Sequence, residues 1–458
     1  MNRRRALGTI LGAAASMPAQ AARKSNIVFI LVDDLRWNAL GYAGHPFVKT
    51  PNIDRVAREG AIFKNNFVTT PLCSPSRASF LTGQYVRSHT VKGNGDNAEL
   101  SHKLITFQKL LRDAGYETAH VGKWHMGNDD TPRPGIDRWV SFRGQGQYND
   151  PPLNVDGQRI TREGYITDLL TDYSVEFIKK PRTKPFCLYL AHKAIHGPFT
   201  PAARHANLFT GQTIARTANA KDSLEGKPML QRELPLTPAK KANKKKGPEG
   251  GGGGSSDELI LNQLRCLTSI DEGVGRIWKA LEEIKALDNT LFIFTSDNGY
   301  FWSEHGLGDK RAAYEESIRI PMAARYPRLI KAGGSIDEMT LNIDIAPTFL
   351  ELAGAPIPKT VAGKSMLSLM GGNKKGWRTS FLCEYYMEQQ QARVATWEAV
   401  RTARWKYIHY PELKNMDELY DLKADAGEMK NLVANPGARK ALDTMRKELD
   451  KYRKEIPA

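Results

Sequence analysis

The sequence predicts an α/β fold, a large sheet covered by helices on both faces. Short runs of apolar and β-branched residues alternate along the chain with segments whose apolar residues recur at helical spacing. This alternation is typical of strands buried between two layers of helices. The chain has 458 residues, of which 41% are hydrophobic. It is therefore long enough for one large α/β domain with a smaller appendage.

Four apolar runs are the predicted strands of the large sheet, and four amphipathic segments are the predicted helices. We expect the strands at 27–32, 118–121, 186–190 and 291–295, and the helices at 53–59, 106–114, 168–179 and 258–284. Because these runs are mostly apolar and do not alternate with polar residues, the strands are expected to be parallel and buried on both faces. Ligands of such sheets bind beyond the carboxyl ends of the strands, so the residues after each strand are the first candidates for a site.

A smaller, antiparallel α+β subdomain is expected at the C-terminal end. Its predicted strands lie at 381–386, 399–402 and 405–409, and its closing helix lies at 438–455. We assign residues 22–375 to the large domain and residues 376–458 to this subdomain. Within the large domain, residues 240–256 contain five basic residues followed by five consecutive glycines. Such a segment cannot bury enough apolar surface to order itself, so we expect a flexible surface loop there.

The first 21 residues have the features of an export signal. Residues 3–5 are arginines, residues 6–15 are mostly apolar, and residues 19–21 form a small-residue cleavage site. The apolar run is much shorter than the roughly 20 residues that cross a bilayer. We expect an exported bacterial protein, periplasmic or extracellular, without a membrane span. The adjacent arginines also suggest twin-arginine export.

Charge and cysteine content narrow the possible function classes. The formal net charge of +16 favours anionic partners through long-range attraction. The sequence has neither zinc-finger spacing nor the aromatic and basic signature of RNA-binding modules, so we expect no nucleic-acid partner. The four cysteines, at positions 73, 187, 266 and 383, include no Cys-x-x-Cys pair. If Cys73 is consumed by chemistry, at most one disulfide can form.

Hard oxygen ligands follow two of the predicted strands. Asp33 and Asp34 come directly after the first strand, and Asp297 and Asn298 follow the fourth. Calcium prefers such carboxylate and amide oxygens, whereas zinc prefers nitrogen and sulfur. An acidic pair at a strand end is also a common way to begin a turn. The pattern therefore needs support from elsewhere in the chain.

A second motif, Cys-x-Pro-x-Arg, occupies residues 73–77 and continues to Gly83. The segment is predicted to be a helix that the glycine closes. A cysteine at a helix N-terminus is either a thiolate nucleophile with a low pKa or a small buried thiol. The motif alone leaves both interpretations open.

The eleven residues from Cys73 to Gly83 resemble the signature of the type I sulfatases. In these enzymes of the alkaline-phosphatase-like superfamily, the cysteine is oxidised to formylglycine. The likeness continues along nearly the whole mature chain, in the family's order. Further matching segments are residues 26–34, 50–54, 122–125, 305–307 and 314–317. The resemblance implies a sulfuric ester hydrolase with that superfamily's large sheet, helices on both faces and small C-terminal subdomain.

The resemblance also implies two cofactors, formylglycine made from Cys73 and one calcium ion. Hydrated formylglycine carries two hydroxyls. One attacks the sulfur of a sulfate ester and expels the alcohol, and loss of the proton from the other re-forms the aldehyde and releases sulfate. The implied calcium ligands are Asp33, Asp34, Asp297, Asn298 and residue 73. A formylglycine-generating or sulfatase-maturing enzyme is then a necessary partner.

Three more catalytic residues are implied by their places in the family's motifs. Arg77 and Lys123 lie where the family holds the formylglycine hydrate and offsets the negative charge of the sulfate. His125 lies where the family hydrogen-bonds that hydrate and assists regeneration of the aldehyde.

The leaving group has its own implied partners. His196 resembles the acid that protonates the departing alcohol, whereas nearby His192 is expected to be structural. Lys310 resembles the lysine that bridges the sulfate and the leaving oxygen. Arg311 is adjacent, so the resemblance does not decide between Lys310 and Arg311 for this role.

The implied substrate is a sulfated carbohydrate, best interpreted as 6-sulfated N-acetylglucosamine at the end of a glycosaminoglycan or mucin-type glycan. Segments 122–127, 134–139 and 142–146 resemble bacterial sulfatases of glycan breakdown. Residues expected to contact the substrate's sulfate are Lys123, His196 and Lys310. Selectivity requires side chains that hydrogen-bond the sugar hydroxyls. The candidates for this role are Arg143, Glu384 and His409.

Three alternatives remain. A formylglycine-dependent phosphonate or phosphate monoester hydrolase of the same fold would also need Cys73, although a single oxygen-rich cation site argues against a two-metal phosphatase. A sulfatase for another sulfated polysaccharide would share the whole catalytic set. A glycan-binding protein without catalysis should lack at least one of Cys73, Arg77, Lys123 and His196, and the sequence contains all four.

Overall fold

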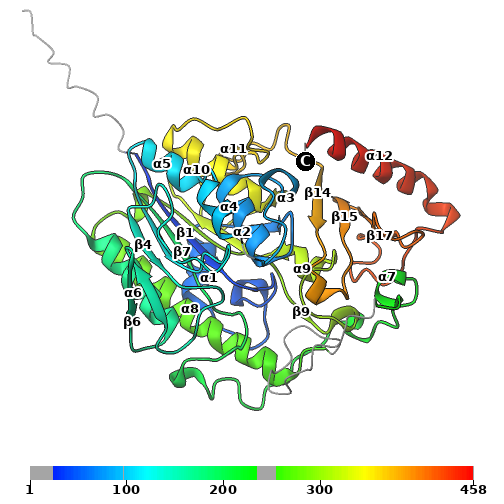
Figure 1. Ribbon diagram of the computed structural model, residues 1–458, viewed down its shortest axis with the longest axis horizontal. Coiled ribbons are helices and arrows are strands. Elements are labelled where there is room, and N and C mark those ends of the chain that lie inside the picture. Colours follow the sequence, from blue (N-terminus) through cyan, green and yellow to red (C-terminus); the bar gives the residue numbers. More distant parts are fainter. Residues whose placement is uncertain (1–23, 96, 235–253, 457–458) are drawn as a thin grey trace, which may run out of the picture.

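The computed structural model describes residues 24–95, 97–234 and 254–456. The predicted export signal lies outside these residues, as do residues 240–253 of the predicted flexible loop. The described chain contains a wide central sheet between two layers of helices, with a smaller sheet beside it (Figure 1). The α/β class predicted from the sequence is therefore confirmed.

Five parallel strands form the centre of the large sheet. In sheet order they are β8 (Thr290–Ser296), β1 (Asn26–Val32), β7 (Phe186–Ala191), β3 (Glu117–Gly122) and β4 (Arg138–Ser141). All residues of β1, β7 and β8 are buried, which explains their continuous apolar sequences. The four strands predicted from the sequence are confirmed as parallel neighbours, so their carboxyl ends meet at one edge.

Six further strands complete the large sheet, and the sequence analysis did not predict them. They are β2 (Ala61–Phe67), β5 (Pro152–Val155), β6 (Gln158–Thr161), β11 (Arg319–Ile320), β12 (Met322–Arg325) and β13 (Gly334–Leu341). β12 pairs antiparallel with β8 and with β2, and β5 and β6 form an antiparallel hairpin at the opposite edge. Most of these strands are short or partly exposed, so they lack long apolar runs. The sheet is thus mixed, with a parallel centre.

Helices cover both faces of the large sheet, and alternate residues of β1 point into the two layers. The Phe29 ring packs on one face, 5.6 Å from both Phe80 and Phe349, while Val28 and Ile30 belong to the core of the other face. The first face is covered by α2 (Cys73–Thr82), α5 (Phe107–Asp113) and α10 (Ile345–Ala353), and the second by α1 (Pro51–Glu59), α6 (Ile166–Lys179) and α8 (Asp257–Glu283) (Figure 1). The four predicted helices correspond to α1, α5, α6 and α8.

Helix α2 carries the cysteine motif into the interior. It begins at Cys73, and all ten of its residues are buried. It ends at Gly83, whose φ of 70° is left-handed and whose N–H donates to the Ser79 carbonyl. A side chain there would be strained, because a Cβ would lie 2.9 Å from Val361. The predicted glycine stop is confirmed.

The smaller sheet has four antiparallel strands in chain order. They are β14 (Ser380–Tyr385), β15 (Trp397–Thr402), β16 (Trp405–His409) and β17 (Glu418–Asp421), and α12 (Arg439–Glu455) packs against them. The sequence predicted all of these elements except β17. One apolar cluster runs from the large sheet into the smaller one, and the rings of Phe67 and Phe381 lie 4.9 Å apart in it. The boundary between residues 375 and 376 stays a prediction.

The remaining α-helices and strands of the described chain are short. They are α3 (Val86–His89), α4 (Ala98–Lys103), α7 (Pro228–Gln231), α9 (Glu315–Ile318), α11 (Leu367–Met370), β9 (Phe301–Trp302) and β10 (Gly308–Asp309). None of the helices in the described ranges has the length and apolar character needed to cross a bilayer. All four cysteines are buried free thiols, so none of the disulfides that the sequence allowed is formed.

Candidate active site

Polar residues that follow the central strands meet at the carboxyl edge of the large sheet. Asp33 and Asp34 follow β1, Lys123 follows β3, and Asp297 and Asn298 follow β8. Because these strands run in the same direction, side chains as far as 264 positions apart in the sequence are in contact. The edge therefore gathers charged and amide groups into one buried cluster.

The three carboxylates of this cluster ionise unequally. Oxygens of Asp33, Asp34 and Asp297 lie within 4.8 Å of one another. Burial raises the pKa of Asp297 to about 7, and the neighbouring Asp33 adds to the effect. Burial also raises the pKa of Asp34, against the attraction of Lys310. Burial opposes ionisation of Asp33 too, but nearby cations, Lys123 first among them, hold its pKa well below the ordinary value.

Asn298 adds an oxygen without a donor beside these carboxylates. Its Nδ2 donates to Asp34 Oδ1 at 2.7 Å and to the Gly299 carbonyl at 2.9 Å. Its buried Oδ1 has no hydrogen-bond partner among the described residues. Such an oxygen costs free energy unless a cation or water meets it. With three carboxylates nearby, it fits a hard cation such as calcium, which takes about 6–8 oxygen ligands.

Arg77 and Lys123 connect helix α2 to the strand ends. Arg77 Nε and Nη2 lie 2.9 and 2.8 Å from Asp297 Oδ2, and Arg77 Nη1 donates to the Lys123 carbonyl at 2.8 Å. Lys123 Nζ contacts the Asp33 carboxylate and donates to Gln145 Oε1 at 2.5 Å. Both cations are buried and held by several partners. They are therefore oriented before any substrate arrives.

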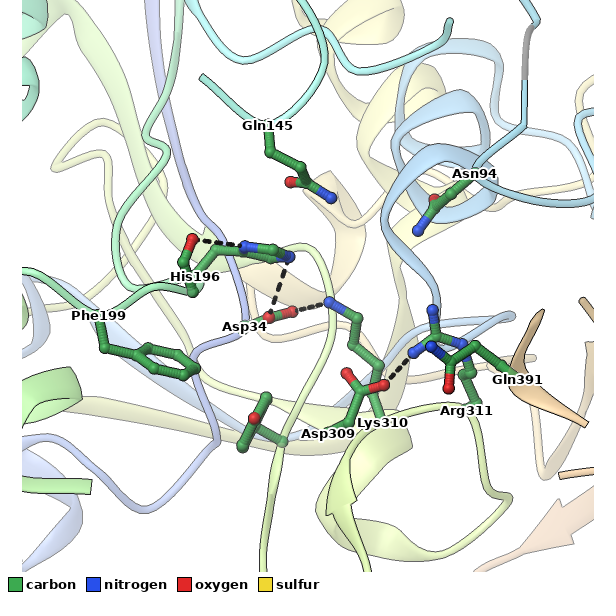
Figure 2. Close-up of a pocket in the computed structure, with 11 residues that line it drawn as sticks. Asp34, Asn94, Gln145, His196, Phe199, Asp309, Lys310, Arg311 and Gln391 are labelled. Atoms are coloured by element: carbon green, nitrogen blue, oxygen red, sulfur yellow. Dashed lines mark hydrogen bonds and ion pairs between the residues drawn. The ribbon is translucent and has the colours of Figure 1, made fainter. Parts of the chain in front are cut away.

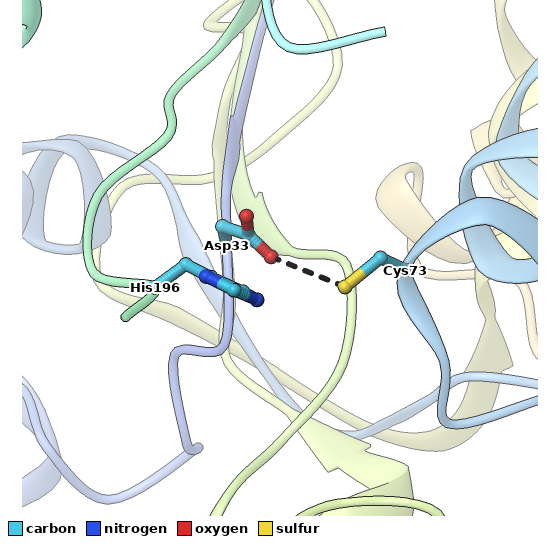
Figure 3. A group of neighbouring side chains, drawn as sticks. All are labelled: Asp33, Cys73 and His196. Carbon is cyan, nitrogen blue, oxygen red and sulfur yellow. Dashed lines mark hydrogen bonds between the residues drawn. The ribbon is translucent and has the colours of Figure 1, made fainter. Parts of the chain in front are cut away.

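Cys73 faces the same cluster, with Asp33 and His196 beside it (Figure 3). Its Sγ lies 3.6 Å from Asp33 Oδ1 and 3.1 Å from Lys310 Nζ. Burial raises the pKa of the thiol to about 12, against the attraction of Lys310. The unmodified residue is therefore a neutral buried thiol and not a thiolate of low pKa.

Lys310 reaches the cluster and Arg311 does not. Lys310 Nζ contacts the Asp34 carboxylate as well as the Cys73 sulfur. Arg311 instead pairs with Asp309 (Figure 2). It also pairs with Glu388 at 2.9 Å. The geometry therefore favours Lys310 where the sequence left two adjacent candidates.

Two histidines flank the carboxylates. His196 Nε2 lies 3.8 Å from Asp34 Oδ2, and the buried Nδ1 of His125 has no hydrogen-bond partner in the described ranges. Burial, followed by repulsion from Lys123, lowers the pKa of both rings well below the ordinary value, so both are neutral imidazoles. His192 is fully buried and does not line the cavity described next, which suits the structural role expected for it.

A cavity of about 130 Å³ opens beside the cluster (Figure 2). Asp34, His196 and Lys310 reach its wall from the cluster. The rest of the wall comes from loops far apart in the chain, with Asn94, Gln145, Gly197, Phe199, Tyr300, Asp309, Arg311 and Gln391. Apart from Arg311, the sequence analysis singled out none of them as site residues. Asn94 and Gln391 are single polar residues in separate loops and form no local motif, so only the fold reveals them.

The three residues predicted to contact the sugar lie elsewhere. Arg143 lines an adjoining cavity. Glu384 is buried and accepts hydrogen bonds from the Arg87 backbone N–H at 3.0 Å and from Arg87 Nε at 2.8 Å. His409 pairs with Asp417 at 3.0 Å. The structure does not bring Glu384 or His409 to the cavity, because each is held by a charged partner at the smaller sheet.

Comparison with known proteins finds relatives along nearly the whole chain. Residues 25–355 match the sulfatase family, and residues 303–455 match the C-terminal family of N-sulphoglucosamine sulphohydrolase. The chain is 33% identical to an N-acetylglucosamine-6-O-sulfatase of Bacteroides thetaiotaomicron, over 92% of this chain and 85% of that protein. It is 29% identical to the N-acetylglucosamine-6-sulfatase of Homo sapiens, over 91% of this chain and 82% of that protein.

A solved structure extends this likeness to three dimensions. The structure of BT4656 in complex with its substrate, D-glucosamine-2-N,6-O-disulfate, matches with a TM-score of 0.85 at 31% sequence identity. The match covers 95% of this chain and 98% of that chain. The two structures therefore share the same fold along almost the whole length of both chains.

Proposed function

The chain belongs to the sulfatase family and is a sulfuric ester hydrolase, and we propose that it removes the 6-O-sulfate of N-acetylglucosamine from the end of a glycan chain. The observation that carries this proposal is the position of Cys73, whose sulfur lies 3.1 Å from the Nζ of Lys310, a residue that lines a charged cavity. The choice of sugar is supported by the names of the relatives from Bacteroides thetaiotaomicron and Homo sapiens. The likeness to a structure that holds a 6-O-sulfated glucosamine supports it further.

The cations of the site suit a sulfate ester, which carries one negative charge spread over three oxygens. Lys310 is assigned to the sulfate because its Nζ lies beside both residue 73 and the cavity. Lys123 and Arg77 lie deeper and neutralise the negative charge that accumulates around the reacting sulfur. Because these cations are already fixed by buried partners, they stabilise the transition state without reorganising.

His196 is assigned as the acid that protonates the leaving sugar oxygen. It lines the cavity, and the Tyr148 hydroxyl holds its backbone by donating to the His196 carbonyl at 2.6 Å. The pKa of His196 is low in the free enzyme because of burial and nearby cations, Lys123 foremost. A bound sulfate adds negative charge beside the ring and raises this pKa, so the proton is taken up with the substrate and passed to the departing oxygen.

Residue 73 is proposed to be formylglycine in the mature enzyme, produced from Cys73 by a maturing partner. Hydrated formylglycine would supply an oxygen nucleophile at this position. Asp33, Asp34, Asp297 and Asn298 would hold a calcium ion, which would make that oxygen more acidic. The backbone of His125 contacts residue 74, since Ser74 Oγ donates to the His125 carbonyl. The free Nδ1 of His125 is assigned to hydrogen-bond the oxygen at position 73. We also assign export of the protein to the signal at residues 1–21.

The substrate proposal is tested by comparing kcat/KM on four compounds: N-acetylglucosamine 6-sulfate, galactose 6-sulfate, a 2-sulfated uronic acid and an aryl sulfate. We expect a clear preference for N-acetylglucosamine 6-sulfate, and no turnover by Cys73→Ala protein that still folds. Preference for another sugar would overturn the substrate. Turnover of a phosphonate monoester but of no sulfate would overturn the reaction itself.

A further inference from the structure

A second cavity, of about 430 Å³, adjoins the first. It lies between the loop that follows β4 and the edge hairpin β5–β6, and Gln145 lines both cavities. Gly144 and Gly146, with φ of 53° and 67°, flank Gln145 in this loop. A Cβ at position 146 would lie 2.5 Å from the Phe142 ring. The tight turn therefore fixes Gln145 as a shared wall between the two spaces.

The wall of the second cavity carries more positive than negative charge. The buried Asp130 lies 2.8 Å from Arg159 Nη2 and 3.8 Å from Arg143 Nε. Asp130 is the sole ionic partner of either arginine within the described ranges, and the two arginine side chains are 52% and 59% exposed. Two guanidinium groups thus share one carboxylate. They keep free donors with the geometry for bidentate binding of a carboxylate or sulfate.

Apolar groups complete the wall. Phe142, Pro152 and Leu153 line the same space. A mixture of apolar surface and a few directed polar groups is typical of sites for small ligands such as single sugars, whose rings have apolar faces. The second cavity therefore offers both a surface for a sugar ring and cations for an acidic substituent.

We propose that the second cavity binds the next sugar of the glycan chain and prefers one with a negative charge, either a uronate carboxylate or a second sulfate. This inference rests on the proposed function, because the sulfated sugar in the first cavity determines where the chain continues. A negatively charged neighbour sugar contacts Arg143 and Arg159. A neutral neighbour leaves both guanidinium groups without a partner beyond Asp130.

The proposal is tested with three disaccharides that carry N-acetylglucosamine 6-sulfate at the non-reducing end. The neighbouring sugar is glucuronic acid, 6-sulfated galactose or unmodified galactose. We expect kcat/KM on each acidic disaccharide to exceed that on the neutral one by about fivefold, the upper end of the range for one exposed ion pair. Arg159→Gln and Arg143→Gln should each shrink this ratio towards one. Arg439→Gln, at another exposed arginine, which lies in α12 and has its own acidic partner, should leave the ratio intact.

A binding measurement separates this inference from the proposed reaction. Calorimetry on Cys73→Ala protein should show tighter binding of the acidic disaccharides, and Arg159→Gln in that background should remove the difference. Equal kcat/KM on all three disaccharides, or a ratio unchanged by both arginine variants, would overturn the subsite. If wild-type protein hydrolyses no sulfate ester but still prefers acidic disaccharides in calorimetry, the reaction fails and the subsite stands. Equal binding of the acidic and neutral disaccharides would contradict the subsite, whether or not the wild-type protein hydrolyses sulfate esters. Melting curves of the variants exclude unfolding as the cause.

Discussion

The side chains at the strand ends are buried charges that hold one another in place. Asp33 keeps its negative charge because Lys123 and Arg77 lie beside it. Burial raises the pKa of Asp297, so this carboxyl group ionises less readily. Site residues could be predicted from the sequence where they form a contiguous motif, as in the segment that begins at Cys73. The sequence was uninformative for cavity residues such as Asn94 and Gln391, because each is a single polar side chain in a separate loop.

Arg77→Lys tests whether the guanidinium shape matters. Lysine carries all three of its N–H donors on a single nitrogen, so it cannot reproduce the fork through which Arg77 contacts both Asp297 and the Lys123 carbonyl. We expect kcat to fall by about 100-fold or more, the typical cost of removing one preorganised group that stabilises the transition state. Arg378→Lys is the matched control, because Arg378 is also buried and paired with a buried carboxylate, Asp344. It should lose stability in urea but keep kcat, and an Arg77→Lys enzyme with normal kcat would refute the assigned role.

Asn298→Ala tests the cation site through the oxygen that has no donor. Removing Oδ1 takes away one ligand, so we expect calcium affinity, measured by calorimetry on chelated protein, to fall by at least about tenfold. Chelation should also lower the melting temperature of wild-type protein, because the ion stabilises the folded state that binds it. Asn342→Ala is the control, since Asn342 Oδ1 already accepts from Thr69 N at 3.0 Å. Unchanged calcium binding by Asn298→Ala would contradict the ligand set.

Elements position the site through the loops that join them. The central strands were predictable because burial on both faces makes each a continuous apolar run, as in β1. The edge strands were not predictable, since a strand such as β6 has only exposed residues and is positioned by pairing with its neighbour. The loop after β7 shows the same limit. Its motif suggested His196, but the groups that hold the loop, Lys193 and Tyr148, are recognisable only in the structure.

Lys193 gives this loop a dependence on pH. Its Nζ donates to the Gly197 carbonyl at 2.9 Å and lies 4.6 Å from the centre of the Tyr148 ring, and burial lowers its pKa to about 8. The unfolded chain keeps the ordinary pKa of about 10.4. Between these values the unfolded state binds more protons, so the contribution of Lys193 to stability increases as pH rises from about 8 to 10.

Melting temperatures of wild-type and Lys193→Met protein across this range provide the measurement. The melting temperature of wild-type protein should rise relative to that of Lys193→Met protein as pH increases from about 8 to 10. The difference between the two melting temperatures should be constant below about pH 7. Lys103→Met, at an exposed lysine, should show no such trend. A difference independent of pH would mean that Lys193 keeps an ordinary pKa.

The whole molecule is organised so that both sheets contribute to one site. The large sheet supplies the charged cluster at its carboxyl edge, and Gln391, from the segment between β14 and β15, reaches the cavity wall. Arg311 links the two parts through its ion pair with Glu388. The sequence predicted both parts and the family's chemistry, while the continuity of the apolar core between them came only from the structure.

The central claim is that Cys73 is the precursor of the catalytic group, and the most direct test is the mass of the peptide containing residue 73 from active enzyme. We expect the fraction of peptide that has lost sulfur and two hydrogens and gained oxygen, the change from cysteine to formylglycine, to rise in proportion to kcat across preparations made with and without a maturing enzyme. Fully active enzyme in which residue 73 is still an unmodified cysteine would contradict the account.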